Sequence, residues 1–235
     1  MDVALYMVAT PIGNLEDITY RAVKTLGGVD VIACEDTRHT SLLLQHYDIH
    51  KRLIACHSYN EAASAQGIIS LLGQGQSVAY VSDAGTPGIS DPGARLSEAV
   101  RKAGYLVVPV PGPSAVITLI SAAGFVGKSF TMEGFLSPKA GRRNTRLKEL
   151  LGRNEAFVIY ESPFRVVKTL KEIAALAPER ELLAGREMTK IHEEYLKGTA
   201  EEIARNLEGR PAVKGEFAIL VKPAREGSDD QPEEA

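Results

Sequence analysis

Short apolar runs alternate with helix-type patterns through the first half of the chain. The runs are rich in β-branched residues and lack polar alternation, which is typical of strands buried on both faces of a sheet. The expected strands cover residues 3–9, 29–34, 53–56, 77–82 and 105–110, and the helices that follow them cover 19–28, 37–47, 60–75, 93–104 and 114–124. Five such strand-and-helix units predict an open parallel sheet with helices on both faces.

The pattern changes near residue 125. Expected strands at 129–135, 156–161, 181–187, 193–199 and 216–222 are mixed with helices at 163–177 and 199–207 and with a basic loop and helix after residue 135. The predicted fold class is therefore α/β with two domains, an N-terminal parallel-sheet domain (1–124) and a C-terminal mixed-sheet domain (125–223). Residues 224–235 form an acidic tail with too few apolar side chains to fold, so we expect it to be disordered.

Composition adds an expectation about location. The 235 residues are 44% hydrophobic and 24% charged, with no uncharged apolar run of the ~20 residues that span a bilayer. The start carries the acidic Asp2 where a signal peptide has positive charge. The two cysteines, Cys34 and Cys56, each end an apolar run and are expected to be reduced core residues. We therefore expect a cytoplasmic protein without a membrane span.

The net charge of −3 is concentrated at the end of the chain. The tail contributes −4, which leaves the body at +1. A body close to neutrality argues against broad nonspecific attraction to nucleic acid, so any such contact requires a local basic patch.

Three loops rich in glycine and proline follow three of the five parallel strands. They cover residues 9–15, 82–93 and 111–115. Open α/β sheets bind ligands at the carboxyl ends of their strands, and such loops let main-chain groups approach a ligand closely. The dinucleotide fingerprint of a nicotinamide enzyme is missing after the first strand. For each of the three loops, the alternative interpretation is a stiff loop that has no role in binding or catalysis.

Eight spaced motifs resemble the ribosomal RNA small-subunit methyltransferase I family of the tetrapyrrole-methylase superfamily. They run in order from about residue 4 to residue 221 and read ATPIGNLEDITYRA, CEDTRHTSLLL, VSDAGTPGISDPG, PGPSA, EGFLSPKAGRR, YESPFR, GREMTK and GEFAIL. The resemblance implies a two-domain homodimer that binds S-adenosylmethionine between its domains. It also implies methylation of the ribose 2′-oxygen of a decoding-centre cytidine in 16S ribosomal RNA, free or within the small ribosomal subunit.

The resemblance also implies the cofactor-binding residues. In the loops these are Pro11, Ile12, Gly13, Asp83, Ala84, Gly85, Thr86, Pro87, Ile89, Ser90, Ser114 and Ala115, and in the second domain Glu161 and Met188. One departure is Tyr59, which stands where relatives often carry a histidine. No metal is expected, because methyl transfer from a sulfonium is an in-line displacement that mainly requires alignment of donor and acceptor.

The acceptor hydroxyl needs a base or polarising group as its proton leaves. Glu35, Asp36 and Arg38 follow the second strand and are the predicted catalytic residues, with one carboxylate orienting or deprotonating the hydroxyl. The alternative is that Asp36 caps the next helix and Arg38 pairs with a neighbouring acid. A second polar cluster, His57, Asn60 and Glu61, is also possible.

A basic segment at residues 139–148 is the predicted RNA-binding element. It holds five cations and no acid: Lys139, Arg142, Arg143, Arg146 and Lys148. Such side chains bind phosphates and position a nucleic acid. A solvated helix face is the alternative for this segment. For the whole protein, the alternatives are a methyltransferase of the same fold that acts on a tetrapyrrole or other small acceptor, and a non-enzymatic RNA-binding assembly factor.

Overall fold

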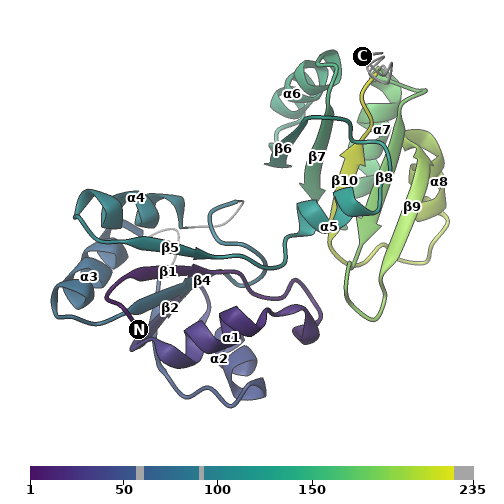
Figure 1. Ribbon diagram of the computed structural model, residues 1–235. Helices are drawn as coiled ribbons and strands as arrows, with labels where there is room; N and C mark the ends of the chain where they lie inside the picture. Colours follow the sequence, from purple (N-terminus) through teal and green to yellow (C-terminus); the bar gives the residue numbers. More distant parts are fainter. Residues whose placement is uncertain (57–60, 90–92, 225–235) are drawn as a thin grey trace, which may run out of the picture. The chain divides into compact units, whose positions relative to one another are not determined.

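The computed structural model describes residues 1–56, 61–89 and 93–224 (Figure 1). The chain divides into two compact units, Met1–Ser114 and Ala115–Ala235. The division lies ahead of the expected boundary at residues 124–125, because the helix after Ser114 packs on the second sheet. The prediction of a disordered tail concerns residues 224–235, of which 225–235 lie outside the described residues.

The first unit contains a five-stranded, all-parallel sheet. Its strands are β1 (Leu5–Val8), β2 (Val31–Cys34), β3 (Arg52–Ala55), β4 (Val78–Val81) and β5 (Val107–Val110), in the order β3-β2-β4-β1-β5. Between them lie the 3-10 helix η1 (Leu15–Asp17) and the helices α1 (Tyr20–Gly28), α2 (Thr37–His46), α3 (Glu61–Gly73) and α4 (Ala94–Lys102). The parallel sheet predicted from the unbroken apolar runs is confirmed.

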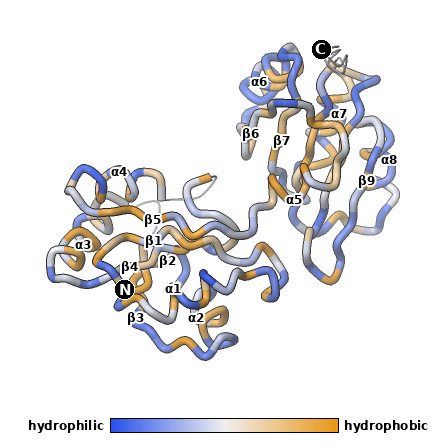
Figure 2. Tube along the Cα trace, in the orientation of Figure 1, coloured by the Kyte–Doolittle hydropathy of each residue, from blue (hydrophilic) through white to orange (hydrophobic). Residues whose placement is uncertain are grey.

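Helices cover both faces of this sheet. Alternate strand residues such as Tyr6 and Ile32 pack with α1 and α2, whereas Leu5 and Val31 pack with α3 and α4 on the other face. Figure 1 shows the two helix pairs on opposite sides, and in Figure 2 hydrophobic residues gather along β1 and β5. Cys34 and Cys56 are both buried, and no disulfide joins them. They belong to the clusters on opposite faces of the sheet.

The neighbouring strands β1 and β4 form a topological switch point. The chain leaves β1 toward α1 on one face and leaves β4 toward α4 on the other. The loops that follow the two strands therefore diverge at the carboxyl edge of the sheet, which is where open α/β sheets bind their ligands.

The second unit contains a mixed five-stranded sheet in the order β6-β7-β10-β8-β9. Its elements are α5 (Ala115–Ser121), β6 (Phe130–Phe135), α6 (Ala140–Gly152), β7 (Ala156–Glu161), α7 (Val166–Leu176), β8 (Glu181–Arg186), β9 (Glu194–Thr199), α8 (Ala200–Glu208) and β10 (Phe217–Val221). Only β6 and β7 pair in parallel within this described sheet, and the other pairs are antiparallel. The predicted mixed sheet is confirmed.

Helices cover both faces of the second sheet as well. Helices α6, α7 and α8 pack on one face around Phe157, Ile159 and Ile219. On the other face Val116 and Leu119 of α5 pack against Val158. This burial of α5 places the division between the units ahead of that helix. None of the helices in the described residues is long and apolar enough to span a membrane.

Candidate functional site

The three glycine- and proline-rich loops meet at the carboxyl edge of the first sheet. Thr10, after β1, and Gly85, after β4, exchange two main-chain hydrogen bonds of 2.9 and 3.0 Å as an isolated antiparallel bridge. The hydroxyl of Thr86 donates to the carbonyl oxygen of Pro113, after β5, at 2.9 Å. The loops that sequence analysis selected separately therefore form one hydrogen-bonded unit over β4, β1 and β5.

Two glycines allow this close approach. Gly85 has φ of +76°, and a Cβ at this position would lie 3.3 Å from Cγ2 of Ile12. A Cβ at Gly112 would lie 3.0 Å from Cβ of Ala9. A larger residue at either position would push the loops apart, and at Gly85 it would also adopt a strained backbone conformation.

The loop after β2 joins the same edge. The main-chain N–H of Asp36 donates to Oδ1 of Asp83 at 3.0 Å. The carboxylate of Asp83 therefore links the loop after β4 to the predicted catalytic segment. Four strand-end loops are thus brought together, and Glu35 stands at the start of one of them.

The predicted cofactor residues of these loops differ in accessibility. Pro11, Gly85, Pro87 and Ser114 are buried; Ile12, Thr86 and Ala115 are half-buried; Gly13, Asp83, Ala84 and Ile89 are exposed. Ser90 lies outside the described residues. The exposed members have small or short side chains apart from Ile89, so the loop backbone stays open to a ligand. Main-chain groups at this edge are therefore accessible to a small molecule.

Asp36 and Arg38 adopt the structural alternative foreseen for them. The Asp36 carboxylate caps α2 by accepting the N–H of Arg38 at 2.8 Å, and it pairs with the Arg38 guanidinium at 2.9 Å. These hydrogen bonds lower the pKa of Asp36 from its ordinary value to about 2. Such a weakly basic carboxylate is a poor proton acceptor near neutral pH.

Glu35 is then the remaining carboxylate of the predicted catalytic set. It is half-buried directly after β2. In the alternative polar cluster, His57 and Asn60 lie outside the described residues, and Glu61 begins α3.

Glu161 and Met188, predicted from the resemblance as cofactor residues, are buried inside the second unit. The Glu161 carboxylate is 2.7 Å from Nε of Arg165 and accepts the Thr169 hydroxyl at 2.8 Å and the Ser162 N–H at 2.9 Å. Met188 belongs to the core cluster beneath α5. Their side chains therefore contribute to the packing of the second unit.

The structure corrects the prediction for the basic segment at Arg143, and it pairs a second cation, Arg146, with carboxylates. The Arg143 side chain is only 2% exposed and forms a bidentate pair with Glu172, both N–O distances being 2.6 Å. Arg146 forms a similar pair with Glu133 at 2.8 and 2.7 Å. The Arg143 guanidinium cannot reach a phosphate, and that of Arg146 is paired with carboxylates. The partner acids lie in other segments, so a local count of charges in the sequence does not reveal these pairs. Lys139, Arg142 and Lys148 are exposed.

Replacing Arg143 with methionine should destabilise the second unit by about 3 kcal/mol, because it leaves Glu172 without its partner. It also removes the hydrogen bonds of Arg143 to the carbonyls of Ser137 and Pro138, both 3.2 Å. Urea unfolding measures the loss. The double replacement of Arg143 and Glu172 by methionine should recover most of it, and a double variant as unstable as the single one would contradict a paired role.

The pH dependence of this pair has a definite sign. The hydrogen bonds from Arg143 lower the pKa of Glu172 below its ordinary value. The stabilisation is therefore complete above the unfolded-state pKa of about 4.3 and is lost as the pH falls through the lowered folded-state value. The stability difference between wild type and Arg143→Met should shrink in that acidic range.

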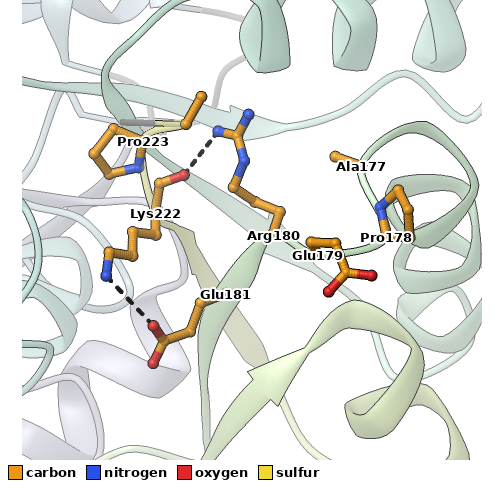
Figure 3. Close-up of a pocket in the computed structure, with 8 residues that line it drawn as sticks. Ala177, Pro178, Glu179, Arg180, Glu181, Lys222 and Pro223 are labelled. Atoms are coloured by element: carbon orange, nitrogen blue, oxygen red, sulfur yellow. Dashed lines mark hydrogen bonds and ion pairs between the residues drawn. The ribbon is translucent and has the colours of Figure 1, made fainter. Parts of the chain in front are cut away.

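An open depression of about 470 Å³ lies elsewhere in the second unit (Figure 3). It is lined by residues 177–181 and 222–224, where Arg180 donates to the carbonyl oxygen of Lys222 at 2.9 Å. It lies where β8 begins and β10 ends, and it contains none of the predicted site residues. In the described part of the chain, no cluster of three His, Cys, Asp or Glu residues is placed to hold a metal ion.

Two exposed aromatic residues were not among the predicted site residues. Phe135 and Phe164 lie within the quoted motifs EGFLSPKAGRR and YESPFR, yet neither was assigned a role. They are 64% and 94% exposed at the carboxyl ends of β6 and β7. Their position beside proline-containing turns was the only local signal.

Known proteins resemble the chain over nearly its whole length. The family model described as tetrapyrrole (corrin/porphyrin) methylases matches residues 4–204. A ribosomal RNA small subunit methyltransferase I from Borrelia garinii subsp. bavariensis is 49% identical over 92% of this chain and 97% of its own length. Proteins of the same name from Vibrio cholerae serotype O1 and Escherichia coli O157:H7 are 46% and 44% identical, over 98% of this chain and 81% and 82% of theirs.

Solved structures show the same fold at lower identity. Cobalt precorrin-4 methyltransferase, a cobalamin biosynthetic enzyme, matches with a TM-score of 0.68 at 15% identity, over 94% of this chain and 95% of that one. Uroporphyrin-III C-methyl transferase from Thermus thermophilus, complexed with S-adenyl homocysteine, matches with a TM-score of 0.64 at 17% identity, over 93% and 97%. At these identities the likeness concerns the fold alone.

Proposed function

Because this chain belongs to the ribosomal RNA small subunit methyltransferase I family, within the tetrapyrrole methylases, we propose that it is an S-adenosylmethionine-dependent methyltransferase of small-subunit ribosomal RNA. The finer proposal is transfer to the 2′-oxygen of a cytidine ribose in the decoding centre of 16S ribosomal RNA. The observation that supports the proposal most strongly is the 42–49% identity to eight proteins named ribosomal RNA small subunit methyltransferase I. Neighbours with porphyrin or corrin names are only 15–20% identical, which disfavours a tetrapyrrole acceptor.

The four joined loops of the first unit suit this cofactor. The Thr10–Gly85 bridge and the Thr86–Pro113 hydrogen bond fix the loop backbone before any ligand binds. Exposed Gly13 and Ala84 leave room for an adenosine or methionine moiety beside main-chain N–H and C=O groups. S-adenosylmethionine supplies an electrophilic methyl group on a sulfonium. A preorganised loop backbone lowers the entropic cost of aligning donor and acceptor.

The acceptor side requires a proton to leave the ribose hydroxyl. Among the three predicted catalytic residues, Asp36 and Arg38 form an ion pair, and the Asp36 carboxylate also caps α2. We therefore assign proton acceptance to Glu35, at the end of β2 beside the Asp36–Asp83 link. Asp36 and Arg38 act as positioning residues for this loop.

We also propose a homodimer and an RNA surface on the second unit. The homodimer is supported by the family resemblance stated above. The RNA surface is supported by the exposed cations Lys139, Arg142 and Lys148 on the start and outer face of α6. The proposed RNA surface therefore consists of these three cations and not of all five cations in the basic segment.

Neutralising Lys139, Arg142 and Lys148 together, each to glutamine, should flatten the salt dependence of RNA binding. Removing one phosphate-binding cation reduces the logarithmic salt slope by about 0.9 units on a duplex, or by about 0.7 on single strands. The measurement is RNA titration across a salt series. A separate titration with adenosylmethionine should give wild-type affinity.

A matched control neutralises three exposed cations of the first unit, Arg21, Lys24 and Arg95. This variant changes the net charge equally but leaves α6 intact, so its slope should stay closer to wild type. Equal slopes for the two triple variants would show that the segment is an ordinary solvated helix face.

A further inference from the structure

The two missed aromatic residues lie where the neighbouring parallel strands β6 and β7 end. Phe135 is the last residue of β6, and Phe164 lies in the turn after β7. Neither belongs to the core clusters of this unit. Phenylalanine gains stability from burial, so a ring that is 94% exposed, as at Phe164, forgoes most of that gain. We call Phe135 and Phe164 the aromatic edge.

The segments carrying the two rings are neighbours. Phe135 and Tyr160 are register partners on β6 and β7, and their rings meet edge-on with centroids 5.6 Å apart. The guanidinium of Arg165, next to Phe164, donates to the carbonyl oxygen of Leu136 at 3.0 Å. The turn after β7 is thereby tied to the residue that follows Phe135.

Buried charged side chains fix the loop after Phe135 and the turn that contains Phe164. Glu161 binds the Ser162–Arg165 turn through the Ser162 N–H and the Arg165 guanidinium. Arg143, paired with Glu172, donates to the carbonyls of Ser137 and Pro138 in the loop after Phe135. The exposed rings are therefore presented by fixed loops, which reduces the entropic cost of binding a ligand.

Exposed cations lie in the segment that follows Phe135. Lys139 ends the loop that begins after Phe135, and Arg142 lies in the first turn of α6. Exposed aromatic rings beside cations are the combination with which proteins bind single-stranded nucleic acid, because bases stack on the rings while phosphates pair with the cations. A base-paired helix offers no free base faces to such a surface.

We infer that the aromatic edge, with Lys139 and Arg142, binds unpaired nucleotides of the RNA substrate by stacking their bases on Phe135 and Phe164. The inference rests on the proposed function and deepens it, because it specifies that RNA is bound in a single-stranded form. The acceptor chemistry stays with the loops of the first unit.

The chain has no tryptophan, so a single Phe164→Trp replacement introduces a unique fluorophore at the aromatic edge. Base stacking on the indole ring should quench its emission when a short unstructured RNA oligonucleotide is added. The same sequence annealed to its complement should quench it much less. The inference would be overturned if the emission did not change on addition of the single strand, or if the duplex quenched it equally.

Phe135→Ala and Phe164→Ala test the energetic contribution. Each should weaken binding of the same oligonucleotide by roughly 5- to 150-fold, the usual range for one stacked base. Adenosylmethionine affinity should not change. Phe130→Ala is the matched control, because Phe130 begins the same strand at the opposite edge and is 36% exposed. It should bind RNA as wild type does.

Three results would count against RNA stacking. They are unchanged RNA affinity in both variants, a loss confined to adenosylmethionine, and a light-scattering mass that falls from dimer to monomer with RNA affinity retained. The last would make the aromatic edge a subunit interface. Methyl transfer by the wild-type protein, assayed in parallel, separates failure of this inference from failure of the proposed function.

Discussion

Replacing Ala84 with tryptophan should weaken adenosylmethionine binding at least about 100-fold, or ~2.7 kcal/mol, while the protein stays folded. Ala84 is exposed, and its φ is not among the positive values of the chain. A large ring is therefore accommodated without backbone strain, but it occupies the space that we assign to the ligand. Calorimetric titration gives the affinity, and thermal unfolding verifies the fold.

Ala84→Ser is the matched control, since it changes the same exposed position without adding bulk, and it should bind nearly as wild type does. Gly85→Val is a poorer test, because the φ of +76° and the contact with Ile12 make it disturb the loops directly. Wild-type affinity in a folded Ala84→Trp protein would move the cofactor away from this edge.

Glu35→Gln should lower the rate of methyl transfer by roughly 10²–10⁴-fold, the usual contribution of a general base. Glutamine retains the shape of the side chain but cannot accept the hydroxyl proton. Adenosylmethionine affinity should remain close to wild type, because the change concerns the chemical step. Single-turnover assays with labelled cofactor measure the rate.

Asp36→Asn supplies the comparison one residue along the chain. Asparagine still caps a helix, and the pKa of about 2 makes Asp36 an unsuitable proton acceptor. Its rate should fall far less than that of Glu35→Gln. The reverse order of effects would exchange the roles that we assign to the two carboxylates.

The fold could be predicted from sequence because its signals are local. Unbroken apolar runs identified the strands of the first sheet, and the change to a mixed pattern of strands and helices near residue 125 identified the second sheet. The boundary between the two units was harder to predict from the sequence. Val116 and Leu119 give α5 the same amphipathic pattern whichever sheet it covers, and only tertiary packing assigns it to the second unit.

The cofactor loops could be predicted for a similar reason, since glycine and proline indicate special backbone geometry in the sequence itself. The charged residues could not. Arg143 is paired with Glu172, 29 residues away, and Glu161 is engaged by Arg165 and Thr169. Burial of these groups depends on how distant elements pack, so a count of nearby charges overestimated the number of cations available to RNA.

The central claim is most directly tested by incubating the purified protein with methyl-labelled S-adenosylmethionine and small ribosomal subunits from cells that lack it. Nuclease mapping and mass spectrometry then locate the label. We expect one labelled ribose 2′-oxygen, on a cytidine of the decoding centre in 16S ribosomal RNA, and a Glu35→Gln protein that labels it far more slowly. Label on a base, label on a different RNA, or no transfer to either subunits or naked RNA would contradict the proposed function.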